Sequence, residues 1–402
     1  MPSRVGGRGY GRRMRLLHTS DWHLGRTLHG VDLLDHQAAA LDHLVDVVRA
    51  ERVDAVLVAG DVYDRAIPPV EAVTLLSDAL ARLSELTTVV LTSGNHDSAT
   101  RLGFGAALMR ERVRLRTRVA TLAEPVEVAD GLVYGLPYLD PDLTRGDLAS
   151  ADEEGGTPVL PARSHEAVTS AAMRRVRADL AGRRGGVRRT VVMAHAFVVG
   201  GQPSESERDI RVGGVDQVPA GVFAGMDYVA LGHLHGPQGL SGVDGTVLRY
   251  SGSPLAYSFS EQHHTKSSVL VDLSGAEPVT ELVPAPVPRR LADVTGTLDQ
   301  LLGTAGEAQV DDWVRVTVTD AARPLELFRR VRERFPHALV VQHVPTDGAA
   351  RTTASRVVTA AADPLEVVDA FVRRVTGTAP TPAEVAVLRR AYEDVADAER
   401  SA

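Results

Sequence analysis

The sequence contains no cysteine among its 402 residues. This absence excludes a disulfide scaffold, a thiolate zinc site and a cysteine nucleophile. Any bound metal ion must therefore be held by oxygen and imidazole ligands. The sequence has 14 histidines that can supply the imidazole.

Long apolar runs and an excess of positive charge are also missing. No stretch approaches the roughly 18 apolar residues that a membrane-spanning helix needs. The Arg-rich segment Met1–Arg13 lacks the apolar core of a signal peptide, so we expect a disordered extension, with Met14 as an alternative start. The formal net charge of −8 argues against a chain that grips nucleic acid through bulk positive charge. We expect a soluble, cytoplasmic protein without membrane association.

Length and composition indicate a globular protein of several domains. At roughly 150 residues per domain, 402 residues suggest two or three domains. A content of 44% hydrophobic and 24% charged residues excludes wholesale disorder. Lys266 is the only lysine, which we attribute to the codon bias of a GC-rich genome rather than to a function.

Five short apolar runs predict strands that are buried on both faces, because they consist mostly of Val, Leu and Ala. The runs are Met14–Thr19, Val53–Ala59, Thr88–Thr92, Thr190–Ala194 and Met226–Leu231. Helical patterns at 35–51, 68–83 and 164–181 lie between them. This alternation predicts an α/β layered domain, which hairpin strands within 242–272 would close.

A proline-dense strip at 284–289 marks the end of this first domain. Beyond it, strands at 313–318 and 339–344 enclose a helix at 324–335, which predicts a small α+β domain. Two further helices begin at Asp363 and at the capping box Thr381–Glu384, which predicts a C-terminal helical hairpin.

Polar residues follow all five apolar runs at the point where each run ends. The blocks are Asp21-Trp22-His23, Gly60-Asp61-Val62-Tyr63-Asp64, Gly94-Asn95-His96-Asp97, Ala194-His195 and Gly232-His233-Leu234-His235. Taken singly, each block is more often an ordinary turn or surface loop. Taken together, they point to one site, because ligands bind at the carboxyl ends of strands in open α/β sheets.

The residue types in these blocks are those of a site for two metal ions. Imidazole, carboxylate and carboxamide groups without a thiolate suit manganese, iron or zinc-type divalent ions. Asp21 and Asp61 are the obvious anions, since one carboxylate can bridge two ions. Two such ions stabilise the attacking and leaving oxygens of a phosphate diester and acidify the attacking water.

His96 directly follows Asn95, so the two side chains are not expected to point the same way. If Asn95 is a ligand, His96 is better placed as the general acid for the leaving alkoxide or as a stabiliser of its charge. Such a histidine needs an orienting partner, for which Asp64 and Asp97 are the candidates. The alternative is that His96 is a simple turn residue.

In this order, the five blocks resemble the calcineurin-like metallophosphoesterase superfamily. Three of them are similar to the bacterial nuclease subunits of the SbcD group: Ser20–Arg26, Gly60–Pro69 and Ser93–Ser98. The resemblance covers about residues 14–285, and the tail resembles the family only in layout. It implies a layered α/β metallophosphoesterase sandwich of mixed sheets flanked by helices. The nuclease domain would span 14–285, the capping domain 286–355 and a helical partner-binding region 356–402.

The resemblance also implies a role for each site residue. One ion would be surrounded by Asp21, His23, Asp61 and His235. The other would be surrounded by Asp61, Asn95, His195 and His233. Asp61 would bridge the two ions, His96 would be the catalytic histidine, and Asp64 stands where bacterial members also carry Asp.

The activity that the resemblance implies is Mn²⁺-dependent hydrolysis of DNA, as a 3′→5′ exonuclease on duplex ends and an endonuclease on hairpins. It further implies an SbcC-type coiled-coil ATPase partner, a homodimer of this subunit within a heterotetramer, and a role in DNA repair, recombination and replication at the nucleoid. With a net charge of −8, the metals and the partner would do much of the DNA binding.

Two other functions remain open at this point: a stand-alone phosphodiesterase acting on nucleotides or other small diesters, and a scaffold whose metal site has decayed. Every ligand-type position is occupied, which argues against decay. Arg26 and Arg101 are candidates for phosphate contacts or are ordinary solvated arginines. The C-terminal hairpin either packs on its own domain or docks onto the partner's coiled coil.

Overall fold

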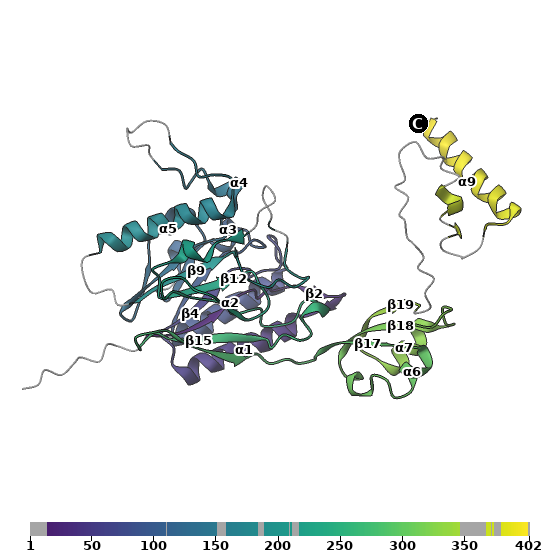
Figure 1. Cartoon of the computed structure of the whole chain (residues 1–402), viewed down its shortest axis with the longest axis horizontal. Helices are drawn as coiled ribbons and strands as arrows, with labels where there is room; N and C mark the ends of the chain where they lie inside the picture. The colour runs from purple at the N-terminus through teal and green to yellow at the C-terminus, as the bar shows by residue number, and fades with distance from the viewer. Residues whose placement is uncertain are drawn as a thin grey trace, which may run out of the picture. The chain divides into compact units, whose positions relative to one another are not determined.

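The computed structural model describes residues 14–109, 111–150, 158–183, 189–208, 210, 217–345, 367–370, 372–373 and 379–400. The predicted extension Met1–Arg13 lies outside these residues. The chain divides into two compact units, Met1–Pro345 and Thr346–Ala402 (Figure 1). Within the described residues, no helix has the length and apolar content to cross a membrane.

The first unit contains two six-stranded mixed sheets. The first sheet has the spatial order β16 (Val279–Pro284), β15 (Ser267–Asp272), β1 (Arg15–Thr19), β4 (Ala55–Ala59), β5 (Thr88–Thr92) and β6 (Val113–Arg116). Strands β1, β4, β5 and β6 are parallel to each other. At one edge, β15 runs antiparallel to β1, and β16 runs antiparallel to β15.

The second sheet has the spatial order β13 (Gln238–Leu240), β14 (Val247–Tyr250), β12 (Tyr228–Gly232), β9 (Arg189–His195), β8 (Gly131–Gly135) and β7 (Val126–Val128). Its four central strands are parallel, and its two edge strands are antiparallel to their neighbours. There are also two short two-stranded ladders: β2 (Thr27–Leu28) with β3 (Val31–Asp32), and β10 (Phe197–Val198) with β11 (Gln217–Val218).

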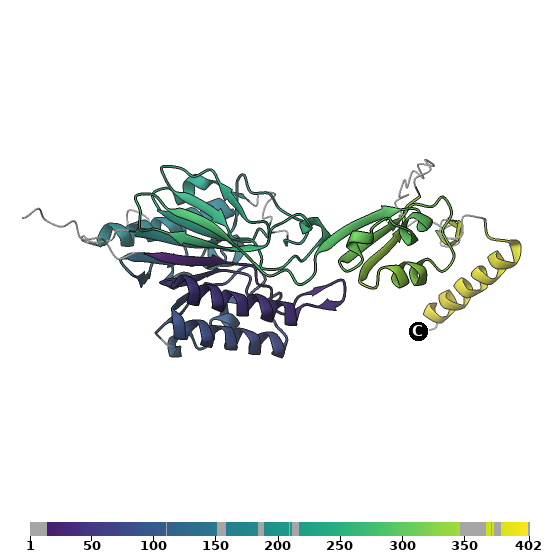
Figure 2. The ribbon, with the colours of Figure 1, turned by 90° about the horizontal axis from the view of Figure 1, so that it is seen from below.

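Helices cover the outer face of each sheet, so the domain has four layers (Figure 2). The long helices α1 (Leu34–Glu51) and α2 (Val70–Leu86) pack on the first sheet, and α5 (His165–Gly182) packs on the second. The short helices are α3 (Ala99–Leu102) and α4 (Pro141–Thr144), with 3₁₀ turns at Ala106–Leu108, Val119–Thr121, Ala220–Phe223, Phe259–Glu261 and Glu307–Gln309.

The inner faces of the two sheets share one core. Leu16 and Leu57 of the first sheet pack in the same buried cluster as Met193 and Ala230 of the second. Alternate residues of the same strands, such as Leu17, face the helices instead, which explains why these runs are apolar throughout.

A histidine of β1, His18, is buried between the sheets. The His18 Nδ1 lies 2.9 Å from the hydroxyl oxygen of Tyr228, and its Nε2 lies 3.2 Å from the carbonyl oxygen of Leu231. Burial lowers the pKa of His18 to about 3, so the ring is neutral and joins the two sheets through hydrogen bonds.

The small domain after the proline-rich strip is built on three parallel strands, β17 (Leu291–Gly296), β18 (Trp313–Val318) and β19 (Ala338–His343). Helices α6 (Leu298–Leu302) and α7 (Leu327–Arg334) connect them. The sequence predicted β18, α7 and β19 but not β17 and α6, which make the domain a β-α-β-α-β unit.

The second unit contains α9 (Pro382–Arg400). The predicted capping box is present, because the Thr381 N–H donates to the Glu384 carboxylate and the Glu384 N–H donates to the Thr381 hydroxyl. Residues 367–370 and 372–373 are helical, and most of the rest of the first predicted helix lies outside the described residues.

The layered α/β fold is confirmed, and two local predictions are corrected. The helix predicted from residue 68 begins at Val70, because the extended Pro69 precedes it as the N-cap. The predicted hairpin within 242–272 is wrong: β14 pairs with β12 and β13, whereas β15 pairs with β1 and β16. The two strands therefore belong to different sheets.

We expect the substitution Leu57→Ala to destabilise the protein by about 2–5 kcal/mol, because it removes a fully buried side chain from the core between the sheets. The matched control is Leu143→Ala, since Leu143 is 78% exposed and its loss should change stability by less than about 0.5 kcal/mol. Urea unfolding followed by circular dichroism measures both. Equal losses for the two variants would contradict the assignment of this core.

Candidate metal centre

The five strands β1, β4, β5, β9 and β12 deliver their polar blocks to one edge of the sandwich. Parallel pairing places Thr19 opposite Val58 and Ala59 opposite Thr92, so the first three strands end at a common level. His195 pairs with Gly232 in the second sheet. All nine predicted site residues come together here through the contacts that follow.

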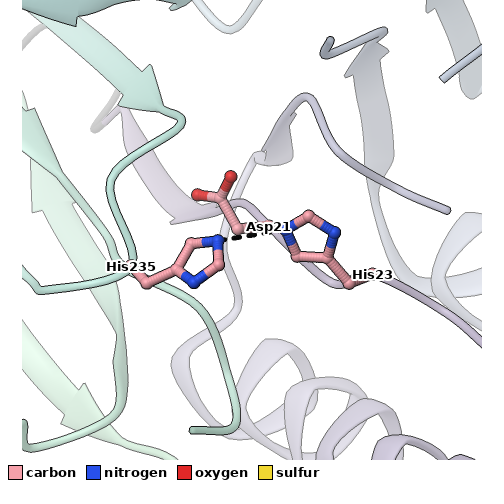
Figure 3. Close-up of side chains that lie close together, drawn as sticks. All are labelled: Asp21, His23 and His235. Atoms are coloured by element: carbon pink, nitrogen blue, oxygen red, sulfur yellow. Dashed lines mark hydrogen bonds between the residues drawn. The ribbon is translucent and has the colours of Figure 1, made fainter. Parts of the chain in front are cut away.

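The first cluster contains Asp21, His23 and His235, all buried (Figure 3). The Nε2 atoms of the two rings face each other at 3.0 Å. The Nδ1 of His23 is buried without a hydrogen-bond partner among the described residues. Each of the three residues offers a ligand atom within 4.8 Å of the others, which is the arrangement that a single metal ion requires.

The second cluster contains Asp21, Asp61 and His195. Asn95 adjoins it, because its carboxamide oxygen lies 2.8 Å from the His195 Nε2 and 3.2 Å from the His233 Nδ1. An imidazole nitrogen and an amide oxygen are both ligand types for divalent ions. The set therefore fits a second ion.

Asp61 is a member of the second cluster and also faces the first, whereas Asp21 belongs to both. Its Oδ2 is 3.4 Å from the His195 Nε2 and 3.6 Å from the His23 Nε2. Its Oδ1 accepts a hydrogen bond of 2.9 Å from the His96 main-chain N–H, which fixes the carboxylate. A carboxylate in this position can serve both clusters at once.

The backbone is strained where it carries these side chains. Asp21, His23, Asp61 and His233 have φ angles of 54°, 45°, 47° and 103°, which non-glycine residues rarely adopt. Such strain is found at functional sites, where it fixes the aim of a side chain. Glycine is required beside them, because a Cβ on Gly94 would lie 2.1 Å from the Asp61 Oδ1.

Burial and mutual proximity shift the ionisation of these groups. Burial raises the pKa of Asp21 to about 6, despite the opposing effect of His195 and His235. Burial would also raise the pKa of Asp61, but His195, His23 and His96 outweigh it and hold that pKa well below its usual range. Burial lowers the pKa of His23 and His233, which keeps both rings neutral, the form that binds metals.

His96 is oriented by a main-chain carbonyl. Its Nδ1 lies 2.7 Å from the Asp64 carbonyl oxygen, which places the ring proton on Nδ1, while the Nε2 lies 3.9 Å from the Asp61 Oδ2. The sequence predicted that a carboxylate of Asp64 or Asp97 would orient this ring. Instead, the Asp64 carboxylate lies 3.8 Å from the His23 Nδ1, and that of Asp97 accepts three main-chain N–H groups, from Val62, Tyr63 and Gly94.

Glu261 and Lys266 form a buried support behind His235 that the sequence did not predict. The Glu261 Oε1 lies 3.3 Å from the His235 Nδ1, and its other oxygen is ion-paired with the Lys266 ammonium. Lys266 also donates to the His235 carbonyl and the Ser253 hydroxyl, both at 3.0 Å. The only lysine therefore has a structural role, which the composition did not predict.

Two family models match the chain. The model described as calcineurin-like phosphoesterase matches residues 14–237. The SbcD_C model, described as the type 5 capsule protein repressor C-terminal domain, matches residues 287–376.

Solved structures with a similar arrangement include TT1561 of Thermus thermophilus, with 14% identity, 67% of this chain and 99% of that chain covered, and a TM-score of 0.39. GAP50, the anchor in the inner membrane complex of Plasmodium, is 11% identical, with a TM-score of 0.38. The match covers 68% of this chain and 84% of GAP50. A dimetal phosphatase from Danio rerio is 11% identical, with a TM-score of 0.37. The match covers 66% of this chain and 98% of the phosphatase.

The phosphoesterase model spans more than half of the chain, and the SbcD-type model follows it in the C-terminal part. Family members use divalent metals, and the buried His and Asp clusters fit such ions. The chain belongs to the calcineurin-like metallophosphoesterase superfamily, and its pair of domains is that of the SbcD-type nucleases.

Proposed function

We propose that this chain hydrolyses DNA phosphodiesters with a two-metal site, as the nuclease subunit of an ATP-dependent complex of the SbcCD type. The observation that supports this most is the joining of both clusters by the buried carboxylate of Asp61. The SbcD-type C-terminal match favours DNA as the substrate over small diesters. The nuclease domain would span 14–285, the capping domain 286–355 and the partner-binding region 356–402.

The proposed ligands of one ion are Asp21, His23, Asp61 and His235. The proposed ligands of the other are Asp61, Asn95, His195 and His233. The ions, which we propose to be Mn²⁺, would supply Lewis-acid stabilisation of charge on the attacking and leaving oxygens.

We assign proton donation to the Nε2 of His96. Its Nδ1 proton is held by the Asp64 carbonyl, so the Nε2 is the ring atom directed towards the Asp61 carboxylate and the site. When the ring is protonated as imidazolium, the Nε2 also carries a proton. It can give this proton to the leaving oxygen of the cleaved diester, which leaves the ring neutral with its remaining proton on Nδ1. The Asp64 main chain acts as the positioning group for this step, and its carboxylate adjoins His23 and Arg26.

The proposed assembly includes an SbcC-type coiled-coil ATPase and a second copy of this chain, acting in DNA repair, recombination and replication at the nucleoid. The net charge of −8 supports shared binding, because a polyanion is held weakly by a chain with an excess of acids. The metal ions, nearby arginines and the partner would share the binding of DNA.

We expect the chain, mixed with its ATPase partner, ATP and Mn²⁺, to shorten duplex DNA from its 3′ ends and to open hairpins. Chelation of the metal should abolish both reactions. End-labelled duplex and hairpin substrates resolved on denaturing gels measure the products. Turnover of bis-p-nitrophenyl phosphate with no cleavage of DNA, even with the partner present, would instead support a small-diester phosphodiesterase.

We expect the unsubstituted chain to bind about two Mn²⁺ ions and the Asp61→Asn variant to bind fewer than about one, because both ions would share this carboxylate. Metal analysis by mass spectrometry after equilibrium dialysis measures this ratio. The control Asp46→Asn removes an exposed carboxylate of α1 and should keep both ions. Full occupancy in the Asp61→Asn variant would refute the bridging role.

We expect His96→Asn to lower turnover by about 10²–10⁴-fold, the usual effect of losing a general acid. Its metal content should stay near that of the unsubstituted chain, because the ring is proposed as a proton donor rather than a ligand. Turnover and metal content are measured on the same preparation. A loss of metal would show that His96 is a ligand.

A further inference from the structure

The segment Ser204–Arg208 reaches the metal centre although it belongs to none of the five strand-end blocks. The Ser206 hydroxyl lies 2.7 Å from the His235 Nδ1. The Glu207 carboxylate accepts hydrogen bonds from the His235 N–H at 2.9 Å and from the Ser204 N–H at 2.7 Å. These contacts hold the segment against the site and thereby fix the position of the main chain at Arg208.

Arg208 lies on the outer side of the Asn95–His96 turn. Its Nη1 donates to the Asn95 carbonyl oxygen at 3.3 Å, and its Nη2 lies 3.4 Å from the His96 Nδ1. That nitrogen already donates its proton to the Asp64 carbonyl, so it cannot accept from the arginine. Among the residues that the structure describes, the Asn95 carbonyl is therefore the only acceptor that takes up one of the five N–H donors of the exposed guanidinium.

The two sides of the His96 ring have different neighbours. The Nε2 faces the Asp61 carboxylate and the metal ligands, whereas the Nδ1 faces the Asp64 carbonyl and Arg208. The group that reacts at the ligands would occupy the Nε2 side. Arg208 is placed to contact something that extends beyond the reacting group.

Arg26, which the sequence made a candidate for phosphate contact, differs from Arg208 in this respect. Its guanidinium lies 3.6 Å from the Asp64 carboxylate, donates to the Ser206 carbonyl at 3.1 Å and stacks on the Tyr257 ring at 5.0 Å. Its charge is paired within the protein, and only 17% of its side chain is exposed. Among the described residues, no carboxylate makes a comparable ion pair with Arg208.

We propose that Arg208 binds the phosphate next to the scissile one and thereby selects polynucleotides over small diesters. A guanidinium matches a phosphate with two parallel hydrogen bonds, and an exposed one loses little solvation in making them. A small diester has a single phosphate, and that phosphate would lie at the metal centre. It therefore has no second phosphate for Arg208 to bind. This inference rests on the proposed nuclease function and specifies its substrate class.

The test compares two substrates on the full chain loaded with Mn²⁺: a short single-stranded DNA oligonucleotide and bis-p-nitrophenyl phosphate. We expect Arg208→Gln to lower the ratio of their kcat/KM values by about tenfold, as for the loss of a hydrogen bond to a charged group. The slope of log kcat/KM against log salt for the oligonucleotide should weaken by about 0.7, the value for one phosphate contact on a single strand. Arg208→Lys should retain part of the ratio.

Arg49→Gln is the matched control, because it makes the same charge change in the last turn of α1, at the opposite edge of the first sheet. It should leave the ratio and the salt slope unchanged. An unchanged ratio in Arg208→Gln would overturn the inference. So would equal losses on both substrates, since they would show that Arg208 acts through His96 on the reaction itself.

A binding measurement separates this inference from the proposed function. Fluorescence anisotropy of a labelled oligonucleotide with the metal-free chain should show weaker binding for Arg208→Gln than for Arg49→Gln by about tenfold. If the unsubstituted chain never cleaves DNA, the proposed nuclease function fails, but the anisotropy still decides whether Arg208 binds the strand. Equal binding by the two variants would refute the role of Arg208.

Discussion

The burial of the Asp61 carboxylate among imidazoles is the interaction on which the rest of this site depends. A buried anion is costly unless positive charge and hydrogen bonds surround it. Here, the His96 main chain holds one oxygen, and His23 and His195 face the other. The absence of a side chain at Gly94 allows this approach, since a Cβ there would overlap the carboxylate. The positive φ angle of Asp61 and the order of the strands both help to place its carboxylate among these groups.

The strand-end residues could be predicted because one physical rule brings them together. Parallel strands end at the same edge, so a polar block after each apolar run converges with the others whatever its distance along the chain. The strand β17 was missed because its sequence, Leu291–Gly296, mixes polar and apolar residues and is only partly buried. The pairing of β14 and β15 was wrong because local alternation identifies strands but carries no information on which sheet each one joins.

The contacts that orient the site were harder to predict than its ligand-type residues. The partner of His96 is a main-chain carbonyl, and every residue type carries one, so composition gives no signal. Glu261 and Lys266 support His235 from a 3₁₀ turn and the residue before β15, where no motif spacing links them to the histidine. Arg208 belongs to the same class, as it lies far along the chain from the Asn95–His96 turn that it contacts.

Both sheets contribute to the centre. Asp21, Asp61 and Asn95 follow strands of the first sheet, whereas His195 ends β9 and His233 follows β12 in the second. An ion held by such a set would add a cross-link between two layers that apolar packing and hydrogen bonds, such as those of His18 and His195, already join. Any ligand that binds only the folded state stabilises it by mass action. With the proposed ions bound here, metal supply and resistance to unfolding would be coupled, and loss of the ions would lower the stability of the sandwich as well as its activity.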